Sequence, residues 1–181
     1  MRFLSCESND FHKEHLNTLK LRLSVFEASY SSVLGADYRK ISGLRIPRSE
    51  KCEILALKAE IEAHELFFNS FVENSERCCK NEIISAIYGS EVKFLYDVLR
   101  YAIDKSGFLI FYLKRSSSIG VYAGPDYARV LMHNDARLAV DLFEHAYFTD
   151  YGFDKEKYLS RALSNLNLSM LNTKNMLQNQ L

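Results

Sequence analysis

The chain has 181 residues, in which 23 lysines and arginines balance 23 aspartates and glutamates, and 48% of the residues are hydrophobic. This length and composition fit one globular domain, or two small lobes that share a core, and exclude a disordered chain. Zero net charge argues against nucleic acid or an anionic membrane as a partner, because both bind through an excess of lysine and arginine. The 7 glycines and 2 prolines are too few for a turn-rich β-sandwich, so we expect a mostly helical chain.

No segment predicts export or insertion into a membrane. The first residues reach charged side chains before an apolar run can build, and the longest apolar run, residues 108–113, is far shorter than the roughly 18 residues that span a bilayer. The four cysteines, Cys6, Cys52, Cys78 and Cys79, contain no C-x-x-C pair. We therefore expect reduced thiols in a cytoplasmic protein that has no membrane partner.

Two amphipathic helices are predicted in the first part of the chain. Over residues 11–34, apolar side chains recur every three or four positions, which is typical of one long helix, and Gly35 is its expected stop. Residues 36–45 are expected to form a polar connection. A second helix is predicted over residues 47–72, with Pro47 in its first turn. Two such helices joined by a short loop make an antiparallel hairpin.

A polar stretch at residues 73–81 predicts a boundary between two lobes, 1–78 and 79–181. The elements expected in the second lobe follow in chain order: helices at 82–88 and 91–104, strands at 108–113, 119–123 and 137–143, and helices at 154–166 and 168–178. The sequence thus predicts an α+β fold, in which a helical hairpin precedes a small antiparallel sheet of about three strands flanked by helices.

The most informative chemistry lies in residues 140–147. Asp141 and His145 are four residues apart at a predicted junction of strand and helix, where a carboxylate and an imidazole can bind one cation. Oxygen with nitrogen suits iron, manganese or zinc better than magnesium or calcium, although such a spacing is also common by chance. His12 and His64 lie near the start of the first helix and deep in the second, so an antiparallel hairpin can bring them to one level. Together the four residues would offer three nitrogens and one oxygen, and the alternative for His64 is a core histidine.

Residues 141–148, Asp-Leu-Phe-Glu-His-Ala-Tyr-Phe, resemble the C-terminal signature D-x-W-E-H-A-Y-Y of the iron/manganese superoxide dismutases. Residues 63–68 resemble the family's N-H-x-x-F-W segment, and residues 11–18 resemble its H-x-x-x-H-H-x-T-Y segment with one residue missing. Residues 106–110 resemble the start of the family's sheet. The resemblance implies the family's fold and the dismutation of superoxide at one iron or manganese ion per subunit, in a homodimer.

Carried over by position, the family's metal ligands fall on four residues: His12, His64, Asp141 and His145. A gapless alignment would instead place Phe11 at the first of these positions. Glu144 matches the glutamate that, in the family, reaches a metal-ligating histidine of the other subunit. Glu60 lies one turn before His64, where the iron type carries a glutamine that hydrogen-bonds the metal-bound water. The alternative interpretation of Glu60 is an exposed helix carboxylate. Tyr147 of the signature is the second candidate catalytic residue.

Several departures from the family leave the activity open. The chain has no tryptophan, and other apolar residues stand where the family lines its metal pocket with tryptophan: Phe68, Phe108, Phe143 and Leu168. The family's gateway tyrosine falls on Leu19 or Lys20, and the glutamine of the manganese type falls near Gly124 and Pro125. The alternatives to a dismutase are a metal-binding or metal-free relative that acts as a structural or interaction protein, and a zinc hydrolase with three ligands and a water.

Overall fold

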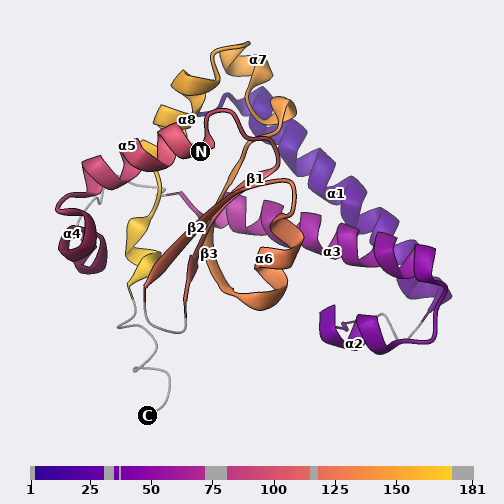
Figure 1. Cartoon of the computed structure of the whole chain (residues 1–181). Helices are drawn as coiled ribbons and strands as arrows, with labels where there is room; N and C mark the ends of the chain where they lie inside the picture. The colour runs from indigo at the N-terminus through magenta and orange to yellow at the C-terminus, as the bar shows by residue number, and fades with distance from the viewer. Residues whose placement is uncertain (1–2, 31–34, 37, 72–80, 115–117, 173–181) are drawn as a thin grey trace.

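A computed structural model describes residues 3–30, 35–36, 38–71, 81–114 and 118–172 of the chain (Figure 1). Its elements follow in chain order: α1 (Cys6–Ser29), α2 (Tyr38–Gly43), α3 (Arg48–Asn69), α4 (Glu82–Tyr88), α5 (Glu91–Ala102), β1 (Phe108–Leu113), β2 (Ile119–Gly124), α6 (Tyr127–His133), β3 (Asp135–Asp141), the 3-10 helix η2 (Glu144–Ala146), α7 (Phe148–Tyr151), α8 (Lys155–Ser164) and the 3-10 helix η3 (Leu168–Leu171). The predicted α+β fold is confirmed, with long helices first and a three-stranded sheet in the second half. None of the described helices is long and apolar enough to cross a membrane.

Helices α1 and α3 run in opposite directions along one another (Figure 1). Helix α1 begins where the Ser5 hydroxyl accepts a hydrogen bond from the backbone N–H of Ser8 at 3.1 Å, which caps the helix. Pro47 lies just before α3 and not within its first turn. The two helices pack through a small apolar cluster made of Leu16, Leu19, Leu57 and Ile61. This packing brings the first turns of α1 level with the last turns of α3.

Both long helices end earlier than predicted. Helix α1 ends before the predicted stop at Gly35, and residues 31–34 lie outside the described part of the chain. Helix α3 ends at Asn69, where the backbone N–H of Ser70 donates to the carbonyl of Phe67, so the helix is shorter than the predicted range 47–72. The predicted boundary between the lobes falls within residues 72–80, which also lie outside the described residues.

The predicted polar connection at residues 36–45 was wrong, because it contains helix α2. Ile41 in this helix is fully buried and packs with Ala36 and Ile54 in a separate apolar cluster. Burying one large aliphatic side chain contributes about 1.5–3 kcal/mol, whereas a helix this short does not form alone. The contact with α3 therefore stabilises α2, and hydrophobic periodicity along the chain could not reveal it.

The three strands form one antiparallel sheet in the order β2-β1-β3. The predicted hairpin of β1 and β2 is confirmed, and Phe108 pairs with Gly124 at its open end. The third strand covers Asp135–Asp141 and not residues 137–143. Asp141 is therefore its last residue, and it pairs with Phe108 on the central strand.

The end of α3 is tied to the sheet by Ser70, which is fully buried. Its hydroxyl donates to the carbonyl of Leu66 at 2.6 Å and accepts from the backbone N–H of Ala139 at 2.7 Å. Because β3 is an edge strand, the N–H groups on its outer side have no ladder partner. Ser70 supplies that partner, and the contact holds α3 against β3.

Two short helices of the second lobe were not predicted. Helix α6 has seven residues and α7 has four. Helix α6 lies between β2 and β3 in the chain and packs on α3 and the sheet, with Leu131 buried. Helix α8 falls within the predicted range 154–166 and packs on α5. The predicted helix at 168–178 is the single turn η3 in the described part, and residues 173–181 lie outside it.

Candidate metal centre

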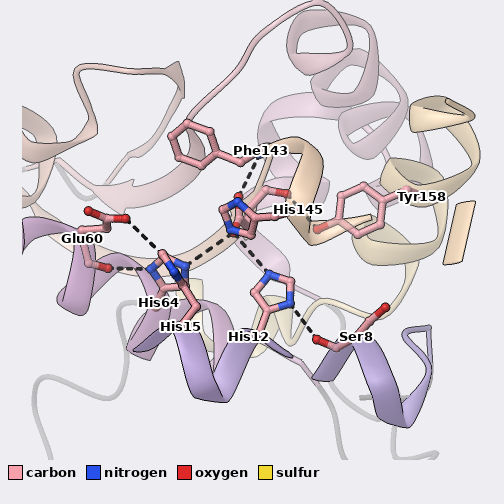
Figure 2. A network of polar contacts seen from close by, with 9 residues as sticks. Ser8, His12, His15, Glu60, His64, Phe143, His145 and Tyr158 are labelled. Carbon is pink, nitrogen blue, oxygen red and sulfur yellow. Dashed lines mark hydrogen bonds and ion pairs between the residues drawn. The ribbon is translucent and has the colours of Figure 1, made fainter. Parts of the chain in front are cut away.

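Four of the chain's five histidines meet where α1, α3 and the end of β3 come together (Figure 2). Two of them are on α1, one is on α3 and one is in η2: His12, His15, His64 and His145. Five of their ring pairs have centroids between 5.0 and 6.2 Å apart. The fifth histidine, His133, is exposed at the end of α6. The cluster also contains the buried carboxylate of Asp141.

Backbone contacts fix Asp141 at the end of β3. Its Oδ1 accepts from the backbone N–H of Phe143 at 2.9 Å, and its carbonyl accepts from the hydroxyl of the buried Tyr158 at 2.8 Å (Figure 2). The next residue, Leu142, donates its N–H to the carbonyl of Gly107 at 2.9 Å. These bonds leave Oδ2 as the oxygen that faces the imidazoles.

Three imidazoles face this one oxygen. Asp141 Oδ2 lies 3.3 Å from Nε2 of His12, 3.1 Å from Nε2 of His145 and 3.6 Å from Nε2 of His64. Burial opposes the charge of the carboxylate, but His12 and His145 outweigh it and hold the pKa of Asp141 well below its usual range. The centre therefore contains one anionic oxygen surrounded by nitrogen atoms.

The backbone of both helices decides which nitrogen of each ring carries the hydrogen. His12 Nδ1 donates to the carbonyl of Ser8 at 3.1 Å, and His64 Nδ1 donates to the carbonyl of Glu60 at 2.8 Å. A carbonyl only accepts, so in each neutral ring Nε2 carries a lone pair. His64 Nε2 is buried and has no hydrogen-bond partner among the described residues. In a neutral ring this lone pair repels the carboxylate oxygen that it faces unless a proton or a metal ion lies between the two atoms, so this donor set fits a metal ion.

The electrostatics of two rings differ although both are near Asp141. Burial lowers the pKa of His64 below its usual value, despite the opposing pull of the Asp141 charge. Burial also favours the neutral form of His145, but Asp141 outweighs it and raises the pKa of that ring. The lowered pKa of His64 favours the neutral ring that binds a metal, whereas the raised pKa of His145 favours a proton that a metal has to displace.

Aromatic rings form an apolar wall around the histidines. Five phenylalanines contact them: Phe11, Phe67, Phe68, Phe108 and Phe143. Phe67 stacks on His12 with the ring centroids 5.2 Å apart, and Phe143 stacks on His145 at 5.6 Å. Phe68, Phe108 and Phe143 stand where the family has tryptophan, whereas Leu168, at the fourth such position, belongs to the main apolar core. A wall of this kind keeps the local dielectric low and strengthens every polar contact inside it.

The structure brings together all four residues predicted as metal ligands, and it distinguishes His12 from Phe11. The His12 side chain is fully buried beside Asp141, whereas Phe11 is 52% exposed. Helix α1 is thus rotated so that His12 faces the cluster. Leu19, at one of the two positions matched to the family's gateway tyrosine, is buried between α1 and α3 and offers no hydroxyl.

The other predicted site residues lie around this cluster. Glu60 Oε1 is 3.2 Å from Nε2 of His15, and both side chains are about a third exposed, at 30% and 31%. Tyr147 stacks on Tyr158 with the ring centroids 5.2 Å apart, and burial raises the pKa of Tyr147. Glu144 is exposed in η2.

Sequence reasoning did not single out His15 or Tyr127. His12 and His15 are three residues apart, so both lie on one face of α1, and this spacing is the signal that could have found His15. Tyr127 lies on the unpredicted helix α6, and burial together with the charge of Glu60 raises its pKa. The Tyr127 ring packs on Phe108 of the apolar wall, with the ring centroids 4.8 Å apart.

Comparison with known proteins identifies one family. A family model described as "Iron/manganese superoxide dismutases, C-terminal domain" matches residues 79–174, more than half of the chain, and this range includes the sheet, Asp141 and His145. A comparison with curated proteins finds no match. As the family's description states, its members use iron or manganese and act on superoxide, so a metal cofactor is implied here. The chain belongs to the iron/manganese superoxide dismutase family.

Proposed function

We propose that the chain is a superoxide dismutase that holds one iron or manganese ion between the helical pair and the sheet. The ligands in this proposal are His12, His64, Asp141 and His145. The observation that carries it is the set of three Nε2 atoms that converge on the ionised Asp141 Oδ2, with His64 Nε2 3.6 Å away and unpaired among the described residues. A cation in this space would replace the repulsion by metal–ligand bonds. Three nitrogens and one oxygen suit a first-row transition metal.

The chemistry that such an ion supplies is electron storage: one superoxide is oxidised to oxygen, and a second is reduced to hydrogen peroxide with the uptake of two protons. The chain's own residues bind the ion and control access to it. The phenylalanine wall excludes bulk water from the buried side. Substrate and protons would arrive where His145, His15 and Glu60 are each about 30% exposed. There, Glu60 Oε1 and His15 Nε2 can hold a proton between them for transfer to the product.

The position of Glu60 favours iron over manganese in this proposal. Glu60 is one turn before His64, in the place that the resemblance gives to the glutamine of the iron type. Residues Gly124 and Pro125, matched to the glutamine of the manganese type, provide no side-chain amide. A carboxylate in place of the amide would also shift the potential of the ion, because groups around the ligands tune the metal.

We further propose a homodimer in the cytoplasm. Glu144 is exposed directly beside His145, where it could contact a second copy of the chain. Cys6 and Cys52 are free thiols, as a reducing compartment requires, and Cys78 and Cys79 lie outside the described residues. Sedimentation of the full chain at several concentrations measures the oligomeric state.

The test combines metal analysis with direct measurement of superoxide loss. Protein produced with iron or with manganese should contain one ion per chain and should remove superoxide faster than the same amount of free metal. The variant His64→Ala should lose both properties, whereas His133→Ala, which removes the one exposed histidine outside the cluster, should keep both. Protein that contains no iron or manganese under either condition would contradict the proposal.

A second function is favoured by the missing tyrosine and glutamine. Leu19 is buried in the α1–α3 cluster, so the first helix places no phenol at this position. A metal-binding protein without dismutase activity would therefore contain one ion per chain yet remove superoxide no faster than free metal. That result would select this alternative, and the same two measurements separate it from the first proposal.

A further inference from the structure

Helix α1 brings a second imidazole, His15, to the proposed metal site (Figure 2). One nitrogen from each of His15, His64 and His145 lies within 4.8 Å of the other two. The His15 ring centroid is 5.0 Å from that of His64 and 5.1 Å from that of His145. One ligand atom from each of His12, Asp141 and His145 meets the same limit. Both groups contain His145, so the two donor sets lie side by side at this residue.

A single ion can bind these nitrogens only if the rings move closer together. Two nitrogens bound to one ion at about 2.1 Å lie about 4.2 Å apart when they are opposite each other and about 3 Å apart when they are neighbours. The required movement is therefore up to about 2 Å. His12 and His64 are fully buried, whereas the His15 side chain is 31% exposed and has room to rotate. His15, like the 29% exposed His145, is thus a member of the cluster that can close on an ion.

Glu60 orients His15 in the way that carboxylates orient ligating histidines. Glu60 Oε1 lies 3.2 Å from His15 Nε2, and a carboxylate only accepts, so Nε2 carries the hydrogen in this contact. The neutral ring then has its lone pair on Nδ1, where a metal can bind it. A carboxylate that holds the far nitrogen of a ligating histidine fixes the tautomer and raises the basicity of the ligand. Glu60 also accepts from His64 through its backbone carbonyl, so one residue orients two rings.

We propose that His15 is a fifth protein ligand of the metal ion, which gives a donor set of four imidazoles and one carboxylate. This inference rests on the proposed metal binding but not on dismutase activity. Five protein donors suit a metal that accepts six-coordinate geometry, as iron and manganese do, and leave one position for a small molecule. If His15 only hydrogen-bonded Glu60, the ion would have four protein ligands and two such positions.

The test uses Co²⁺ as the probe, because its visible absorption spectrum reports the number and type of ligands. The variants are His15→Ala, His15→Gln and Glu60→Gln in the full chain, with His133→Ala as the matched control. Glutamine at position 15 can still donate a hydrogen bond to Glu60 but has no imidazole lone pair. Residue 15 lies on a partly exposed helix surface, where alanine and glutamine are both good helix formers, so folding should be retained and is checked by circular dichroism.

If His15 is a ligand, both substitutions at position 15 change the Co²⁺ bands and weaken Co²⁺ binding by more than about 100-fold, the upper end of the loss for a residue that only orients a ligand. Loss of a residue that only orients a ligand costs about 10–100-fold in affinity, so Glu60→Gln should weaken binding less than His15→Ala does and keep the band pattern. His133→Ala should match the wild type in both measurements. Unchanged bands in His15→Gln would overturn the inference and leave the metal centre intact. Absence of Co²⁺ binding by the wild-type protein would overturn both proposals.

Discussion

The substitution Ser70→Ala should destabilise the fold by removing the contact that holds α3 against the sheet. The Ser70 hydroxyl is the hydrogen-bond partner of the Ala139 N–H on the outer side of β3, at 2.7 Å, and both groups are fully buried. Alanine leaves that N–H unpaired and away from water, which costs about 1–3 kcal/mol. The bond from the hydroxyl to the Leu66 carbonyl is lost as well, although that carbonyl belongs to a helix and is the less costly loss.

We therefore expect the free energy of unfolding of the metal-free protein to fall by about 2 kcal/mol. Urea unfolding measures this as a lower midpoint with an unchanged slope. Ser24→Ala is the matched control: its hydroxyl also donates to a carbonyl of its own helix, that of Leu21, at 2.7 Å, but at an exposed position. Such a change should alter the stability by no more than about 0.5 kcal/mol.

The substitution Ser70→Ala should also weaken Co²⁺ binding. Helix α3 carries His64 and strand β3 ends at Asp141, so loss of the Ser70 contact lets the 3.6 Å separation of their side chains widen. A stability loss no larger than that of Ser24→Ala would refute the reasoning about the buried N–H. A lower stability with unchanged Co²⁺ affinity would show that the position of α3 at the site does not depend on Ser70.

Two further predictions concern the backbone under the site and the response to pH. Gly107 has φ +105°, and a Cβ there would lie 2.2 Å from the carbonyl oxygen of Gly124. Gly107→Ala should therefore lower the free energy of unfolding by at least about 1–3 kcal/mol, as measured by a thermal or urea melt. Gly43→Ala, where a Cβ meets nothing within 4 Å, should be neutral or stabilising, and equal effects of the two would contradict the clash. Because Asp141 overcomes burial and raises the pKa of His145, a proton competes with the metal for this ring, and Co²⁺ binding should weaken as the pH falls through that pKa. The dissociation constant is measured between pH 6 and 8, with proton release recorded in weak buffer, and an equal constant at both ends would exclude this competition.

Local sequence determined the elements and the chemical types at the site. The apolar, β-branched and aromatic run at Phe108–Leu113 became the central strand, because a strand covered on both sides has apolar side chains on both faces. The four-residue spacing of Asp141 and His145 placed both at the end of β3 and the turn after it. These features depend on neighbours in the chain, so they can be recognised without the rest of the molecule.

Tertiary structure alone decided which side chains meet and which short helices form. Phe11 and His12 differ by about 100° around α1, and both fit an amphipathic helix. Contact with Asp141, 129 residues away, determines that His12 faces inward, and the same rotation brings His15 to the cluster. Helices α2 and α6 likewise form because distant elements bury their apolar side chains. The Nε2 atom of His12 and the side chain of Ile41 have their partners outside their own segments. The sequence therefore determined which groups each segment contains, and packing determined which groups they contact.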